Sequence, residues 1–191
     1  VTYLGTFGGS FSGAYALNED TIVGYAATAD ERVHAFAFEN SQMVDLGTLG
    51  GDESIAIDIS RSGEILGVSK ANYASGDPGY PFWVGFVYRD GVVTEIRPSD
   101  GRDVFPAAIN DHGQVVGVLA ETDDLDDYPF LWQEATGIRN LNDLIDPAIG
   151  CRLVTADDIN ASGQVVGLAV CDDGKYPWDD SFVGVLLTPE S

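Results

Sequence analysis

Short runs of apolar, aromatic and β-branched residues recur along the whole chain, and clusters of Gly, Asn and Asp separate them. Typical runs span residues 34–38, 84–88 and 128–132. Runs of this length and composition, bounded by turn residues, are typical of β-strands. No segment shows a convincing helical period, and a turn at residues 141–145 is the best helical candidate. The pattern therefore predicts an all-β protein.

A motif of nine or ten residues occurs four times. It reads AINDHGQVVG at 108–117 and DINASGQVVG at 158–167, with looser copies at 16–24 and 58–67. The closing glycines are 43, 50 and 50 residues apart, so four units of similar length fill the 191 residues. Repeats of this period indicate a repeat architecture. Because each unit carries two hairpins, we expect four strands per unit in meander order.

The fourth unit lacks a last strand, and a matching segment stands at the start of the chain. Residues 1–9 match residues 43–51 with a constant offset of 42. An open solenoid would leave exposed strand edges at both ends, whereas a closed ring would not. We therefore predict one domain, residues 1–191: a four-bladed β-propeller with four antiparallel strands per blade. The predicted units are 6–46, 47–97, 98–141 and 142–191, and strand 1–5 completes the last blade. A β-sandwich built from the same hairpins is the alternative.

These motifs together resemble the HAF repeats of predicted extracellular bacterial and archaeal proteins. The segment DLGTLGG at 45–51, the INxxGQVVG motif and HAF at 34–36 carry the resemblance. The copies cover the whole chain but vary: the histidine of HAF occurs only in the first unit, and LGxLGG is lost from the third and fourth. The resemblance implies secretion and a propeller-like fold, and it implies no defined reaction.

Acidic residues are spread along the entire chain. Asp and Glu number 31 against 9 Lys and Arg, which gives a formal net charge of −22. Such a chain cannot neutralise a row of phosphates, so nucleic acid is excluded as a partner. Anionic membrane surfaces are disfavoured for the same reason, and the apolar runs are too short for a membrane span. A salt-adapted or secreted protein is the expected class.

The two cysteines flank the predicted hairpin around the turn at 160–163. Pairing about that turn places Cys151 and Cys171 nearly opposite each other. We predict a cross-strand disulfide, which indicates an oxidising compartment and supports an extracellular or cell-surface location. Two buried free thiols are the alternative.

The connections between the second and third strands of the units are long, dissimilar and rich in aromatic residues. Variable loops on a repeating frame usually carry recognition. Aromatic rings with polar tips can stack on a sugar or anchor a protein partner, although packing at the blade edge is the alternative. The candidate ligand-binding residues are Tyr73, Tyr80, Trp83, Tyr128 and Trp178.

Carboxylates form two candidate calcium sites, because Ca²⁺ prefers oxygen ligands. One is the loop run of Asp123, Asp124, Asp126 and Asp127, for which a solvated acidic face is the alternative. The other is the pair Asp58 and Asp158, which occupy equivalent positions on the first strands of the second and fourth units. These two acids could instead reach solvent or cap backbone N–H groups.

Signals for catalysis are weak. The sequence has no GxSxG nucleophile elbow and no HxxxH metal motif, and its histidines, His34 and His112, are predicted on different faces. We therefore expect a monomeric, secreted, non-catalytic module that binds a glycan or a protein partner, with calcium the one candidate cofactor. A small polysaccharide hydrolase or lyase, and a purely structural surface repeat, are the alternatives.

Overall fold

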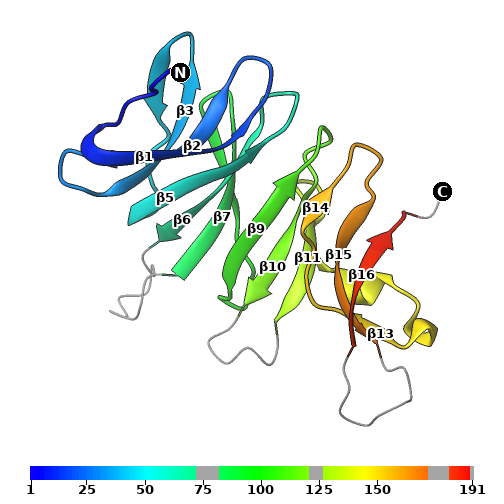
Figure 1. Ribbon diagram of the computed structural model, residues 1–191. Coiled ribbons are helices and arrows are strands. Elements are labelled where there is room, and N and C mark those ends of the chain that lie inside the picture. Colours follow the sequence, from blue (N-terminus) through cyan, green and yellow to red (C-terminus); the bar gives the residue numbers. More distant parts are fainter. Residues whose placement is uncertain (72–81, 121–126, 172–180, 190–191) are drawn as a thin grey trace.

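The protein is all-β in the computed structural model, which describes residues 1–71, 82–120, 127–171 and 181–189 (Figure 1). Three sheets of eight, four and four strands follow one another along the chain. The described residues contain no α-helix. They contain two short 3₁₀ helices, η1 (Leu141–Leu144) and η2 (Pro147–Ile149), and η1 coincides with the predicted helical turn.

The eight-stranded sheet consists of two consecutive antiparallel meanders. The first contains β1 (Gly8–Leu17), β2 (Ile22–Thr28), β3 (Val33–Glu39) and β4 (Gln42–Asp45). The second contains β5 (Gly50–Ile59), β6 (Ile65–Ala71), β7 (Phe82–Arg89) and β8 (Val92–Ile96). A single parallel bridge between Val33 and Glu53 joins them. Each meander therefore corresponds to one sequence repeat.

The other two sheets contain the third and fourth repeats. One has the order β12-β11-β10-β9, with β9 (Asp103–Ile109), β10 (Val115–Ala120), β11 (Tyr128–Gln133) and β12 (Gly137–Asn140). In the other, β15 (Val165–Cys171) pairs with β16 (Ser181–Leu187) on one side. On its other side lie the two short pieces β13 (Cys151–Leu153) and β14 (Asp158–Ile159). We refer to the meanders below as units 1 to 4, and to the turn after the first strand of each as its first turn.

The predicted disulfide is confirmed. Cys151 and Cys171 face each other in the β13–β15 ladder and form a disulfide bond. The bond joins the separated start of the first strand of unit 4 to β15.

Glycine closes every copy of the repeat motif because the first strand passes close to the second at a bulge. A β-carbon at Gly117 would lie 2.3 Å from the carbonyl oxygen of Phe105. The same residue sits at a register shift between β9 and β10. No side chain fits at this approach, so the motif requires glycine there.

The core lies between neighbouring units. Each of three buried clusters combines the second strand of one unit with the first strand of the next. The pairs at these junctions are Val23 with Ile59, Leu66 with Ile109, and Val116 with Ile159. The units are thus held face to face by one junction that is used three times.

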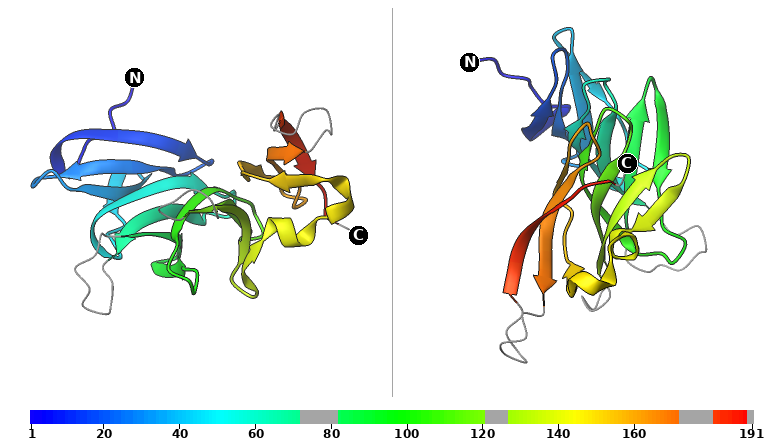
Figure 2. Two further views of the ribbon diagram at one scale, coloured as in Figure 1. Left: turned by 90° about the horizontal axis from the view of Figure 1, so that it is seen from below. Right: turned by 90° about the vertical axis from the view of Figure 1, so that its right-hand side faces the viewer.

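The predicted closure of the ring is not observed. In the described part of the chain, β16 pairs only with β15, and residues 1–5 lie outside every strand. Val1 and Tyr3 are fully exposed or nearly so. Figure 2 shows the four units arranged in an arc, with the first and last units at its two ends. The three internal junctions set this arrangement, and it holds the chain ends apart.

Candidate functional site

Most of the predicted loop residues cannot be placed. Tyr73, Tyr80 and Trp178 lie outside the described residues, as do Asp123, Asp124 and Asp126. Of the same loops, Trp83, Asp127 and Tyr128 are described and half-buried. They lie at the start of β7 and of β11, so the structure describes only the base of the predicted recognition face.

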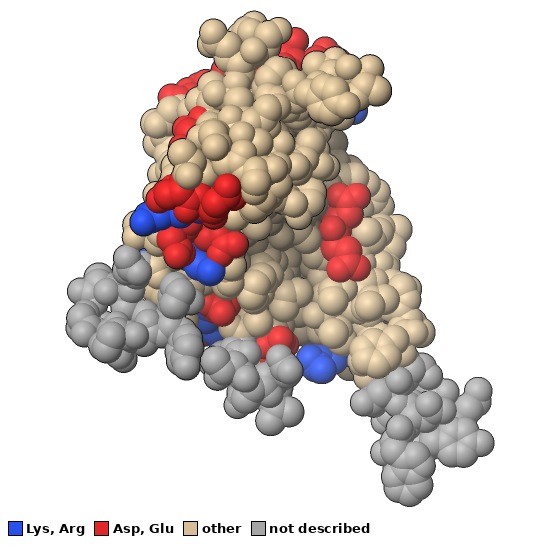
Figure 3. Space-filling view, turned by 60° about the vertical axis from the view of Figure 1, so that its left-hand side comes forward, with Lys and Arg blue, Asp and Glu red and all other residues tan. Residues whose placement is uncertain are grey.

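Both described aromatic candidates carry a basic side chain on the ring. The Lys70 ammonium lies 5.2 Å from the centre of the Trp83 ring, and the Arg102 guanidinium lies 5.3 Å from that of Tyr128. Lys70 also forms an ion pair with Glu53, and this hydrogen bond raises the lysine pKa above its usual range. On the face shown in Figure 3, the few basic atoms likewise lie beside acidic ones. One side of each ring is therefore covered, which leaves less area for stacking than the sequence suggested.

Asp58 links two units through backbone hydrogen bonds. One carboxylate oxygen accepts from the N–H of Ile59 at 2.8 Å, and the other accepts from the N–H of Ile109 in unit 3 at 2.9 Å. Asp158 accepts from Ile159 at 2.8 Å in the same way as Asp58 does from Ile59. These contacts correspond to the capping alternative. No group of three or more His, Cys, Asp or Glu residues suited to a metal occurs among the residues that the structure describes.

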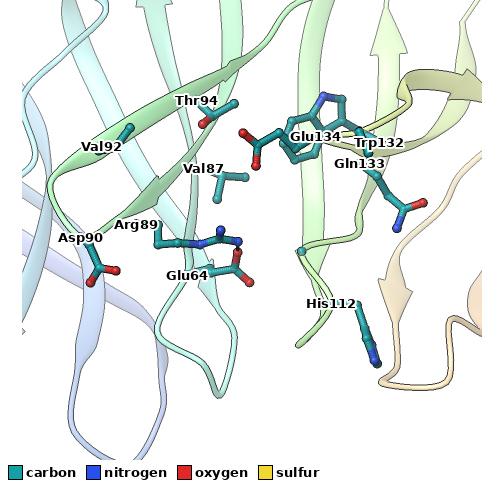
Figure 4. A pocket seen from close by; sticks show the side chains of 12 residues that line it. Glu64, Val87, Arg89, Asp90, Val92, Thr94, His112, Trp132, Gln133 and Glu134 are labelled. Atoms are coloured by element: carbon teal, nitrogen blue, oxygen red, sulfur yellow. Dashed lines mark ion pairs between the residues drawn. The ribbon is translucent and has the colours of Figure 1, made fainter.

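A groove between units 2 and 3 is the more enclosed of two larger hollows among the described residues. It encloses about 410 Å³ and lies between the first turns and the β7–β8 and β11–β12 turns, at the ends of the strands away from the predicted recognition loops. Val87 and the buried Trp132 contribute apolar lining. Figure 4 shows Arg89 and Glu64 meeting in the middle of the groove, with Trp132 and Glu134 contributed by unit 3. A volume of this size matches a small ligand.

An ion pair between Glu64 and Arg89 dominates the charge of the groove. Glu64 is only 4% exposed, whereas the Arg89 side chain is about half exposed. The Ser62 hydroxyl donates a hydrogen bond to the Glu64 carboxylate at 3.3 Å. A buried carboxylate is costly unless paired, so the guanidinium compensates it while its free side faces the groove. The pair offers fixed donors and acceptors to a ligand.

Sequence reasoning missed this pair, although the repeat contains a signal for it. In units 3 and 4 the first turn has Asn110 with Gln114, and Asn160 with Gln164, and each asparagine donates to its glutamine at 2.7–2.9 Å. Unit 2 has Ser60 and Glu64 at these positions. Unit 2 therefore differs from units 3 and 4 at both of these turn positions, so its first turn departs from the repeat.

A second, shallower hollow lies where the first turns converge. Residues 17–19, 59–61, 109–111 and 159–161 line it, three from each unit. Its residues are mostly engaged in contacts between units: the Asn18 side chain donates to Ser60 O, and the Arg61 N–H donates to the Asp111 carboxylate. This hollow is therefore the visible edge of the junctions.

Comparisons with known proteins add no assignment. No protein family matches the chain, and no curated protein gives a significant match. The resemblance to HAF repeats therefore stays a prediction from the motifs. Among the described residues, no helix has the length and apolar character needed to cross a membrane.

Proposed function

We propose that this protein is a secreted, non-catalytic binding module that recognises a glycan in the groove between units 2 and 3. Its units would be blades of the β-propeller type, with four antiparallel strands each and a recognition groove between two blades. The HAF-like motifs and the Cys151–Cys171 disulfide support an extracellular location, because disulfides persist in oxidising compartments.

The composition of the groove favours a ligand rich in hydroxyl groups. Arg89 donates hydrogen bonds, and the carboxylates of Glu64 and Glu134 accept them, while Thr94 can do both. Val87 and Trp132 line the groove with a small apolar area, since they are only 6% and 7% exposed. The lining carries more acidic than basic groups, so a neutral sugar suits it better than an acidic one.

The observation that carries the proposal is the departure of unit 2 from its own repeat. Ser60, Glu64 and Arg89 replace an uncharged turn with an ion pair, and this pair lies in the groove between units 2 and 3. A structural repeat alone has no need of a buried charge at one of several equivalent turns, because a buried pair stabilises a fold no better than neutral packing.

A glycan array followed by titration calorimetry tests the proposal. The informative variant is Ser60→Asn/Glu64→Gln/Arg89→Gln, which gives this turn the residues found at 110, 114 and 133 and removes the pair without leaving an uncompensated charge. Glycan binding should fall at least tenfold. The matched control, Asp143→Asn in η1, removes one charge outside the groove and should leave binding unchanged.

Two results would overturn the proposal: no glycan bound with or without calcium, or a bound glycan whose affinity the triple variant does not change. The second result would return attention to the loop face that contains Trp83 and Tyr128.

A polysaccharide hydrolase is the second candidate, because Glu64 and Glu134 bring two carboxylates into one groove. Glycosidases use such a pair as acid and base or nucleophile. Release of reducing ends from a polysaccharide panel, lost in Glu134→Gln, would favour this candidate over simple binding.

A further inference from the structure

The first unit exposes a residue that is buried in every other unit. Leu17 ends the first strand of unit 1 and is 71% exposed. Its counterparts in the repeat, Ile59, Ile109 and Ile159, are 5–8% exposed. Each of them is covered by the second strand of the preceding unit, and Leu17 has no such cover in this chain.

The last unit exposes the face that, in the other units, covers the first strand of the next unit. Val166 on β15 is 43% exposed, whereas its counterparts Val23, Leu66 and Val116 are fully buried. Leu186 on β16 is 60% exposed, whereas its counterparts Ala37 and Val87 are 6% exposed and Leu131 is half-buried. The two open faces are therefore the two halves of the junction that recurs inside the chain.

Several polar contacts across the junctions join a side chain of one unit to the backbone of the next unit. The Asn18 side chain donates to Ser60 O at 3.1 Å, and Asn110 donates to Asn160 O at 2.9 Å, each toward the next unit. Asp58 accepts from Ile109 N, also in the next unit. On the open side of unit 4, Asn160 and Asp158 stand where they could meet the Asn18 carbonyl and the Leu17 N–H of another first unit.

The N-terminal segment adds a strand to this set. Residues 1–5 have the sequence pattern of 43–47, which contain the end of β4, and precede β1 by the same spacing. In unit 1, β4 pairs with the outer edge of β3. In unit 4, the same edge of β16 has no strand beside it among the residues described. The end of the chain with the Leu17 face thus also carries a segment with the sequence pattern of a fourth strand, and β16 has no such strand beside it among the described residues.

We propose that the face of unit 1, with residues 1–5, docks on the face of unit 4 of a second copy of this chain. Figure 2 shows the units arranged in an arc with the first and last units at its two ends, so the first and last units are not paired within the chain. These two faces are exposed in the described chain, and a second copy would supply the missing half of each junction. Two identical head-to-tail contacts then close a dimeric ring.

Light scattering coupled to size-exclusion chromatography measures the mass of the assembly. The wild-type chain should have twice its 20.3 kDa mass, most completely at about 1 M salt, where the Debye length is about 3 Å and repulsion between the acidic chains is screened. Leu17→Glu should give the single-chain mass. The control Leu144→Glu changes an equally apolar exposed residue on η1 and should remain dimeric.

Crosslinking distinguishes the partners. Leu17→Cys chains are mixed with Val166→Cys chains and treated with a short bis-maleimide, which leaves the native disulfide intact. A covalent dimer that forms only in the mixture supports the proposal. A single-chain mass at every concentration overturns the proposal. A chain that carries both Leu17→Cys and Val166→Cys is the second arm: if it crosslinks efficiently within itself while the mixture of single variants does not, the proposal is also overturned, and a ring closed by one chain is supported.

Discussion

Glu64 depends on Arg89 more than a surface carboxylate would. It is 4% exposed, and the Arg89 guanidinium is the charged group that pairs with it. Arg89→Ala should lower the free energy of unfolding by about 2–3 kcal/mol, below the range for a fully buried pair because Arg89 is half exposed. Urea denaturation measures this loss.

The triple variant Ser60→Asn/Glu64→Gln/Arg89→Gln serves as the control for this prediction. It removes both charges together and restores a turn that units 3 and 4 already use, so its stability should lie near that of the wild type. If Arg89→Ala were as stable as the triple variant, the ion pair would not be compensating a buried charge.

Gly117 tests the close approach of strands within a unit. Its β-carbon would lie 2.3 Å from the Phe105 carbonyl oxygen and 2.6 Å from the Pro106 α-carbon, and both are backbone atoms that cannot move aside cheaply. Gly117→Ala should cost about 1–3 kcal/mol or more in thermal or chemical unfolding. Gly184→Ala meets no atom within 4 Å and should change stability by less than about 0.5 kcal/mol. Equal losses would contradict the packing explanation.

Single residues were only partly predictable from sequence. The motif glycines and the Cys151–Cys171 pair follow from spacing, because a register fixes which residues face each other. The partner of Asp58 did not follow, since its second carboxylate oxygen bonds Ile109 of the next unit and depends on how units pack. Likewise, the groove at Glu64 depends on a residue 25 positions away, Arg89, and on the neighbouring unit.

At the scale of elements, the disulfide holds a divided strand in place. The first strand of unit 4 is split into β13 and β14, and the bond ties β13 to β15 across 20 residues. Cys151→Ser/Cys171→Ser should lower the free energy of unfolding by about 3 kcal/mol, the cost expected for releasing a loop of this length. A reductant should lower the melting temperature of the wild type and leave that of the double variant unchanged. An unchanged melting temperature of the reduced wild type would show that the bond is not stabilising.

Lys70 on β6 gives the molecule a dependence on alkaline pH. Its pKa is raised above the ordinary 10.5 by the hydrogen bond to Glu53, so the stabilisation is complete below 10.5 and is lost as pH rises through the higher folded value. Wild type and Lys70→Met should therefore differ in melting temperature at pH 8, and the difference should shrink as the pH rises above the ordinary lysine pKa and through the raised folded value. A difference that stays constant to high pH would show that packing on Trp83, rather than the ion pair, sets the effect.

Elements were the most predictable level of this protein. Short alternating runs bounded by Gly, Asn and Asp located the strands because both the pleat and the turns leave local signatures. The exception is the divided first strand of unit 4, where residues 154–157 form an irregular segment whose Val154 and Asp157 N–H groups still donate to Leu168 O and Val166 O of β15. The sequence there, Val154 to Asp157, contains no glycine or proline to announce the break.

At the scale of the whole molecule, repeat spacing predicted the units but not how they close. The wrap-around match of 1–9 with 43–51 predicted that residues 1–5 form a strand beside the last unit, whereas in the structure these residues lie outside every strand. The relation between the chain ends depends on how neighbouring units pack, which a repeat spacing in the sequence does not specify. Closure within one chain was therefore an expectation that the fold does not show, while the complementarity behind it remains in the exposed faces.

The central proposal is that the same kind of junction joins neighbouring units within the chain and joins unit 4 of one copy to unit 1 of another. Amide hydrogen exchange of β16 tests it most directly, because strand addition protects the outward N–H groups of that edge. Exchange of Ser181–Leu187 should slow as protein concentration rises, and Leu17→Glu should abolish the slowing. Exchange that is fast at every concentration, and the same in both proteins, would contradict the claim.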